Sequence, residues 1–130
     1  MRRQRDRGAV AVEFALVLPL LVVLTLGVIG FGHAFHVQTV IDNAARDGVR
    51  VLALQDGPDP AAEARDAAIS AASPSVTLTA SQIAVAPEDC NTTVAAPQNA
   101  RVTITLTDFQ LLGGVGTITL TGSGTMRCNG

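Results

Sequence analysis

The sequence predicts an α+β protein in which one long amino-terminal helix crosses a membrane and continues into a small domain. Three observations predict this architecture. An apolar run lies near the start of the chain, helical patterns of apolar and charged residues follow it, and three stretches with period-two alternation occupy the second half. The 130 residues leave room for no more than one small domain beyond the apolar run.

The apolar run extends from Ala9 to Phe35, and nineteen consecutive residues from Phe14 to Gly32 carry no charge. At 1.5 Å per residue, these nineteen span about 28 Å, which is close to the hydrocarbon thickness of a bilayer. The rest of the chain is too small to wrap a helix that is apolar on all sides. We therefore expect a transmembrane helix at residues 9–35, with a kink or local unwinding near Ala15 caused by Pro19.

The charges on the two sides of the run predict its orientation. All nine basic residues are Arg, and four of them lie in the first seven positions, whereas His33 and His36 lie at the far end of the run and Asp42 follows. Since Arg-rich flanks stay in the cytoplasm, we expect a single-pass protein of the cytoplasmic membrane with residues 36–130 outside. From Ala9 onward ten acidic residues face five Arg, which argues against nucleic acid as a partner.

A cleaved secretory signal is the alternative interpretation of this segment. Small residues at Gly32 and Ala34 flank His33 and resemble a signal-peptidase site. However, the run is longer than the usual apolar region of about 7–15 residues, and Glu13 interrupts its start. This alternative would release the remainder as a secreted protein.

Helical patterns continue beyond the apolar run. One face of the continuing helix carries mostly small apolar side chains, which favour close packing against the domain or against a partner helix. Its members are Val37, Ile41, Ala44, Ala45, Gly48, Val51 and Leu52. A second helix is expected from about Ala61 to the stop at Ser73, with Asp59 as its N-cap and Pro60 at its first position.

Three alternating stretches predict an antiparallel three-stranded sheet with one Thr-rich, solvated face: residues 75–85, 101–108 and 117–127. An apolar, glycine-rich loop is expected at 109–116. Contact of this loop with the membrane or a partner, and a simple connecting role, both remain open.

Cys90 and Cys128 are the two cysteines of the chain, and both lie in the region predicted outside the cytoplasm, where disulfides persist. We expect them to form a disulfide that ties the loop at 87–97 to the last strand. Closing a loop of this length stabilises a domain by about 3–4 kcal/mol.

Two blocks of sequence resemble a known class of membrane proteins. Gly8 ends the Arg-rich start, and Glu13 and Phe14 stand fifth and sixth after it, as in prepilins, where a peptidase cuts after the Gly. Further on, residues 42–50 (DNAARDGVR) are similar to the NAAREGAR stretch of TadE-like proteins of tight-adherence pilus systems, with Asp47 where Glu is more common. Together the two blocks cover about the first fifty residues.

This resemblance implies a pseudopilin-like subunit that takes part in assembly of a tight-adherence (Flp-type IV) pilus. It implies a leader at residues 1–8, cleavage between Gly8 and Ala9 by a prepilin peptidase, and assembly through Glu13 and Phe14 with other pilins or pseudopilins. The Glu13 carboxylate would neutralise the amino terminus of a neighbouring subunit in an apolar core. The alternative is a plain anchored or secreted binding domain unrelated to pili.

No catalytic, metal or cofactor site is expected. His33 and His36 lie one helical turn apart, but no third metal ligand is near them in the sequence. No Ser, Cys or acid pairs with them at a recognisable spacing, and the glycines at 113–116 lack the Lys of a phosphate loop. We therefore expect no enzyme and no small-molecule substrate, with the lipid bilayer as a partner.

Overall fold

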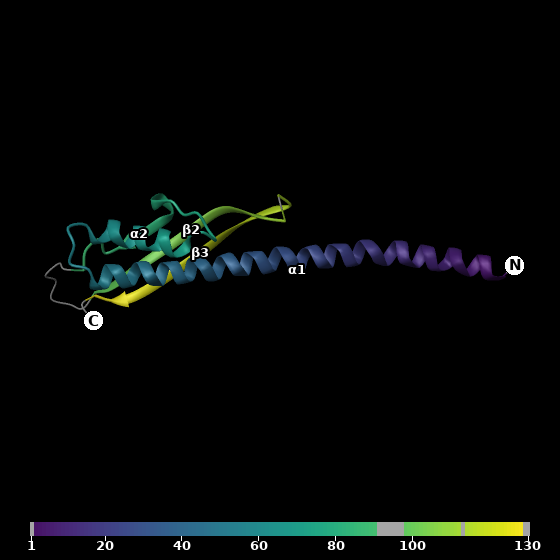
Figure 1. Cartoon of the computed structure of the whole chain (residues 1–130), viewed down its shortest axis with the longest axis horizontal. Coiled ribbons are helices and arrows are strands. Elements are labelled where there is room, and N and C mark those ends of the chain that lie inside the picture. The colour runs from purple at the N-terminus through teal and green to yellow at the C-terminus, as the bar shows by residue number, and fades with distance from the viewer. Residues whose placement is uncertain (1, 91–97, 113, 129–130) are drawn as a thin grey trace.

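The computed structural model describes residues 2–90, 98–112 and 114–128. One long helix forms a rod, and a small domain is built against its carboxy-terminal half (Figure 1). The elements in order are α1 (Arg2–Leu54), α2 (Pro60–Ala72), a 3₁₀ turn (Ala80–Gln82), β1 (Ile83–Ala86), β2 (Asn99–Leu111) and β3 (Gly116–Arg127). The predicted α+β architecture, with a long apolar helix, a second helix and a three-stranded antiparallel sheet, is confirmed.

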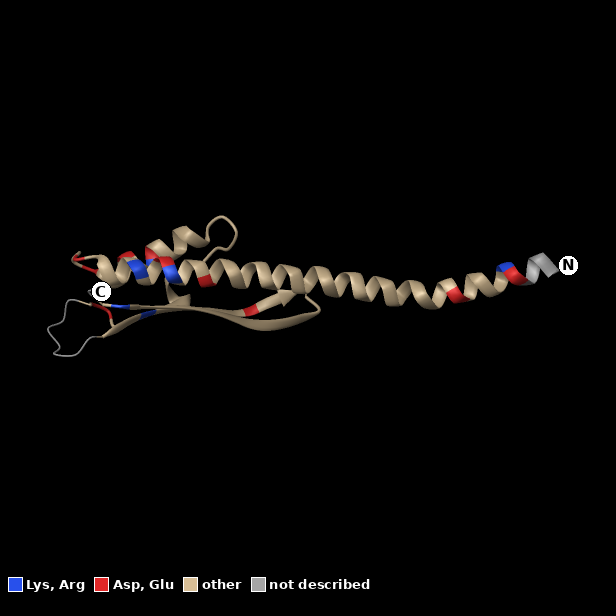
Figure 2. Ribbon diagram, turned by 90° about the horizontal axis from the view of Figure 1, so that it is seen from below, with Lys and Arg blue, Asp and Glu red and all other residues tan. Residues whose placement is uncertain are grey.

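Helix α1 runs for 53 residues, and its amino-terminal half projects from the domain with its apolar side chains exposed. This half is long and apolar enough to cross a membrane. The helix continues without interruption through Pro19, so the local unwinding expected near Ala15 is absent, but the axis of α1 bends in its amino-terminal part (Figures 1 and 2). One missing hydrogen bond is tolerated because the bonds before and after it hold the turn.

Helix α2 begins where the sequence predicted. The backbone N–H of Ala62 donates a hydrogen bond to the Asp59 side chain at 3.0 Å, which caps the first turn. Against α1, a Cβ built on Gly48 would lie 2.9 Å from the Ala64 carbonyl oxygen, so the two helices approach to backbone contact. The small apolar face predicted beyond the membrane segment therefore packs within the domain's own core.

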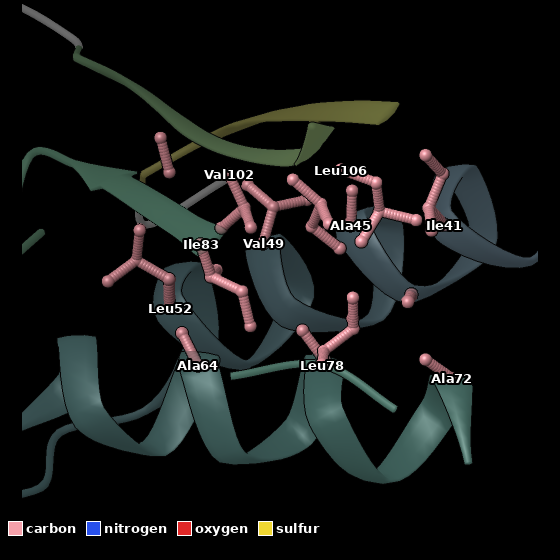
Figure 3. Close-up of a cluster of buried hydrophobic side chains, with 14 of the residues drawn as sticks. Ile41, Ala45, Val49, Leu52, Ala64, Ala72, Leu78, Ile83, Val102 and Leu106 are labelled. Carbon is pink, nitrogen blue, oxygen red and sulfur yellow. The ribbon is translucent and has the colours of Figure 1, made fainter. Parts of the chain in front are cut away.

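The core lies between α1, α2 and the inner face of the sheet (Figure 3). The buried residues that α1 contributes are Ala34, Val37, Ile41, Ala44, Ala45, Val49, Leu52 and Ala53. Val51, which the helical spacing placed on this face, is half-buried, and Val49 is buried instead. The face differs from the prediction because α1 is covered by the sheet as well as by α2.

The sheet has the order β1-β2-β3 with antiparallel pairs, but the first strand is much shorter than predicted. Of the alternating stretch 75–85, residues 83–85 are strand and residues 75–82 are not. The backbone N–H of Thr79 donates to the Gln82 side chain at 2.9 Å and the chain turns there. Such side-chain capping competes with strand pairing, which is why alternation alone predicted the wrong boundary.

Strand β2 is longer than predicted because a β-bulge lets it continue. Leu106 pairs with Leu120, but Phe109 pairs with Ile118, so β2 holds one extra residue between these pairs. Asp108 lies in the bulge with a φ of 59°, a left-handed conformation that Asp adopts more readily than most residues.

The extra residue changes which side chains of β2 face inward. Before the bulge, the buried residues are Ala100, Val102, Ile104 and Leu106; after it, Phe109 and Leu111 are half-buried and their even-numbered neighbours are exposed. The prediction of a loop over 109–116 was therefore wrong at both ends, since β2 extends to Leu111 and β3 begins at Gly116. Gly113 lies outside the described residues.

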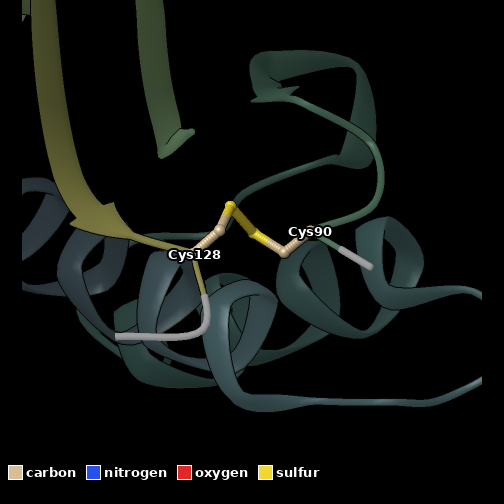
Figure 4. Close-up of a disulfide and its surroundings, with 2 residues drawn as sticks. All are labelled: Cys90 and Cys128. Atoms are coloured by element: carbon tan, nitrogen blue, oxygen red, sulfur yellow. A yellow bond between two sulfur atoms is a disulfide. The ribbon is translucent and has the colours of Figure 1, made fainter. Parts of the chain in front are cut away.

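A disulfide closes the end of the domain farthest from the exposed part of α1 (Figure 4). The sulfur atoms of Cys90 and Cys128 are 2.02 Å apart, and this is the pair expected from the sequence. The Cys128 N–H also donates to the Gln98 carbonyl at 2.9 Å, beside the start of β2. Residues 91–97 of the loop expected to be tied down lie outside the described residues.

Candidate functional site

The residues predicted for processing and assembly, Gly8, Ala9, Glu13 and Phe14, lie close together near the amino-terminal end of α1, and all four are exposed. Ala9 and Glu13 are four positions apart, so they lie one above the other on one side of the helix. Phe14 is 64% exposed although it carries a large apolar side chain. Nothing in the described part of this chain covers the segment.

Glu13 is an isolated charge on this helix. Among the described residues, no side chain forms a salt bridge or hydrogen bond with it, and the next charged residue along α1 toward the domain is Asp42. Figure 2 shows charged residues at the two ends of α1 with a long uncharged stretch between them. A carboxylate beside such an apolar stretch requires water, a proton or a partner from outside the chain.

Gly8 has no structural reason to be glycine within this chain. A Cβ built on it would meet no atom within 4 Å, and its φ is in the ordinary helical range. Glycine destabilises a helix by about 1 kcal/mol relative to alanine. The lack of a side chain at this position is therefore explained neither by packing nor by backbone conformation.

The second block, residues 42–50, lies in the part of α1 that the domain covers. Ala44 and Ala45 are fully buried, and Gly48 lies against the backbone of α2. Arg46, Asp47 and Arg50 are exposed on the other side of the helix, and Asp42 is half-buried. The internal packing of the domain therefore explains the pattern of this block.

The sequence model of a protein family described as "TadE-like protein" matches residues 8–50. The chain is TadE-like over this segment. The match begins at Gly8 and ends at Arg50, so it contains both blocks and confirms the resemblance seen in the sequence. It indicates an involvement in tight-adherence pilus systems. No curated protein and no solved structure matches the chain.

Two glycines of β3, which sequence reasoning missed, fit the sheet onto the TadE-like segment. A Cβ on Gly122 would lie 2.8 Å from the carbonyl carbon of Ile41, and one on Gly124 would lie 2.6 Å from the carbonyl oxygen of Ala45. Backbone therefore packs on backbone along this contact. The sequence signal was present as glycine at alternate positions of a strand pattern, which often marks close approach of another backbone.

The hairpin formed by β2 and β3 also reaches the TadE-like segment on its membrane side. The Phe109 ring packs against His33 with centroids 5.4 Å apart, and both His33 and His36 are exposed. Farther down, a Cβ on Gly30 would lie 2.8 Å from Cγ of Leu112, so the glycine makes room for the leucine. The described residues contain no cluster of three or more His, Cys, Asp or Glu that could hold a metal ion.

The turn of this hairpin holds Leu112 in an unusual conformation. Its φ is 50°, in a left-handed region that costs a residue with a side chain about 1–2 kcal/mol. The backbone N–H groups of Gly114 and Val115 both donate to the Leu111 carbonyl, at 3.2 and 3.1 Å. The turn thereby directs Leu112 onto Gly30 of α1.

Proposed function

We propose that this protein is a membrane-anchored pseudopilin-like subunit that takes part in assembling a tight-adherence pilus. In this proposal, α1 crosses the cytoplasmic membrane once, with its Arg-rich start in the cytoplasm and the domain outside. A prepilin peptidase cuts between Gly8 and Ala9. The mature helix then joins the helices of other pilins or pseudopilins.

The observation that carries the proposal is the contrast within the TadE-like segment. Its second block is buried against α2 and the sheet, and packing accounts for its small residues. Within the part of the chain that the structure describes, its first block has no internal contacts that require Gly8, Glu13 or Phe14. Since the fold of the chain gives these three residues no role, we assign them to partners: the peptidase for Gly8, and neighbouring helices for Glu13 and Phe14.

The chemistry of assembly follows from the charges that cleavage would create. Removal of residues 1–8 leaves an ammonium group on Ala9, one helical turn before the Glu13 carboxylate. Within a bundle of apolar helices, either charge left unpaired would cost several kcal/mol. Pairing the carboxylate of one subunit with the ammonium of its neighbour removes both penalties and fixes the axial position of the incoming helix.

Replacement of Glu13 by Gln tests this function, since it keeps the side chain's size and removes its charge. Glu13→Gln should insert in the membrane and fold normally, because neither membrane insertion nor folding of the domain depends on the Glu13 charge. Capture of partner pilins, or pilus production at matched protein levels, should fall at least about tenfold, since an unpaired buried charge costs more than 1.4 kcal/mol. Glu88→Gln is the matched control, because Glu88 is an exposed carboxylate of the domain.

Two results would count against the proposal. Equal assembly of Glu13→Gln and wild type would leave Glu13 as an ordinary polar residue at the membrane surface. Intact-mass measurement of the same preparations should give a chain that begins at Ala9, and recovery of residues 1–8 with the peptidase present would exclude the proposed processing. A chain beginning at Phe35 would favour the secreted alternative.

A further inference from the structure

The geometry points to a second membrane contact: the tip of the β2–β3 hairpin rests in the outer interface of the same bilayer that α1 crosses. We define the tip as Leu111, Leu112 and residues 114–116. The occupant of this surface is lipid, and the contact needs no other protein. The inference rests on the membrane anchoring proposed above, but not on cleavage or on pilus assembly.

The position of the tip along α1 is the first reason. Leu112 packs at Gly30, which is inside the uncharged stretch from Phe14 to Gly32. At 1.5 Å per residue, Gly30 lies about 3 Å from the outer end of that stretch. If the uncharged stretch fills the hydrocarbon layer, the tip must lie at the outer edge of that layer, because Leu112 of the tip contacts the helix at Gly30.

The chemistry of the tip is the second reason. Val115 is 83% exposed, and Leu112 is partly exposed although it contacts α1. No charged residue occurs between Asp108 and Arg127. At about 3.3 Å per strand residue, Asp108 lies some 13 Å from Leu112 along β2, which places its carboxylate in the headgroup region or in water.

A second apolar surface lies beside the contact between Leu112 and Gly30, where α1 passes β3. A shallow groove of about 210 Å³ runs between α1 and β3 and is lined by Phe31, Ala34, Phe35, Ile118, Leu120 and Gln38. Its one polar side chain, Gln38, donates to the Thr121 carbonyl at 2.8 Å. Exposed apolar patches of this kind mark contact sites. This groove lies along α1, the helix that contains the candidate membrane span.

The backbone of the turn limits how deep the tip can lie in the bilayer. The Leu111 carbonyl accepts two hydrogen bonds within the turn, but irregular backbone exposed to lipid is not tolerated deep in the hydrocarbon layer. The tip therefore lies at the boundary between headgroups and acyl chains, as amphipathic surface elements do. With no Lys or Arg near the tip, binding to zwitterionic lipid should equal binding to anionic lipid.

Single tryptophans in the full chain can test this, because the natural chain contains no Trp and no Tyr. Val115→Trp places the probe at the tip, and Leu24→Trp places it on the exposed middle of the membrane segment. Thr107→Trp is the matched control, since Thr107 is exposed in the bulge of the same hairpin, five residues before Leu112. It also shows whether an added indole by itself draws the hairpin onto the membrane.

The variants are reconstituted in phosphatidylcholine vesicles with and without brominated phosphatidylcholine. Quenching should be strongest for Leu24→Trp, clear for Val115→Trp with bromines near the carbonyl end of the acyl chains, and absent for Thr107→Trp. The emission of Val115→Trp should be blue-shifted relative to that of Thr107→Trp. Added anionic lipid should change neither the quenching nor the emission wavelength. An intact disulfide in each variant, read by non-reducing electrophoresis, reports that the domain has folded.

The results separate this inference from membrane anchoring. If Leu24→Trp is quenched while Val115→Trp behaves like Thr107→Trp, the hairpin contact is overturned and the anchor stands. If Leu24→Trp is not quenched, both are overturned. Quenching of Val115→Trp in vesicles that contain no other protein supports lipid, and not a partner subunit, as the occupant.

Discussion

The two halves of α1 differ in whether their apolar side chains are exposed or buried. In the amino-terminal half the large residues are exposed, for example Leu20 at 70% and Leu24 at 64%. In the carboxy-terminal half the fully buried residues include Ala44 and Ala45. Large apolar side chains are normally among the most buried in a soluble domain, so the first half has a surface suited to lipid or to other helices.

The glycines show the same division. A Cβ on Gly27 or Gly32, in the exposed half, would meet nothing within 4 Å. On the covered half, Gly48 lies close to α2, and Gly122 and Gly124 of β3 lie close to α1. One continuous helix thus serves as an outward-facing rod at one end and as the central support of a small core at the other.

The largest effect is expected when the disulfide is removed, because opening this long loop gives the unfolded chain the most additional conformational freedom. The double variant Cys90→Ser, Cys128→Ser opens a link between residues 38 positions apart and should lower the free energy of unfolding of the domain by about 4 kcal/mol. Urea titration of the full chain in detergent, followed by protease susceptibility of the domain, measures this. Reduced wild type should match the variant, and an unchanged midpoint would show that the domain does not depend on this link.

Truncation of large side chains compares the two halves directly. Ile41→Ala creates a cavity at a fully buried position and should destabilise the domain by about 3 kcal/mol. Leu24→Ala, at an exposed position, should change the stability of the domain by less than about 0.5 kcal/mol. The same urea titration applies to both, and equal losses would mean that the exposed half also contributes to the core.

Added methyl groups give the smallest of the three effects. Gly124→Ala places a Cβ against the Ala45 carbonyl and must push β3 away from α1, at an expected loss of about 2 kcal/mol. Gly27→Ala meets no neighbour and should leave the domain unchanged. Hydrogen exchange of the β2–β3 amides distinguishes the two variants, and unaltered protection in Gly124→Ala would argue against close backbone packing there.

Features that depend on neighbouring residues in the chain were determined by the sequence. The uncharged apolar stretch, the capped start of α2 at Asp59, and the two TadE-like blocks can all be read from the sequence, and the structure and the family match agree with them. Each is a local signal: a run of hydrophobicity, a side chain that bonds three residues ahead, or a short motif. The physical cause of each feature lies in residues that are close together in the sequence, so each feature can be predicted without knowing the rest of the fold.

The tertiary structure alone decided where the strands begin and end and what the hairpin touches. Alternation predicted a strand at 75–85, but a residue is in a strand only if another strand pairs with it, and β2 pairs with no more than residues 83–86. In the same way, one extra residue near Asp108 extended β2 and directed Phe109 toward His33. The contact between Phe109 and His33 joins residues more than seventy positions apart, and the β1–β2 pairs join residues at least 15 positions apart. No local pattern can specify such contacts, because the partner surface exists only once the chain has folded.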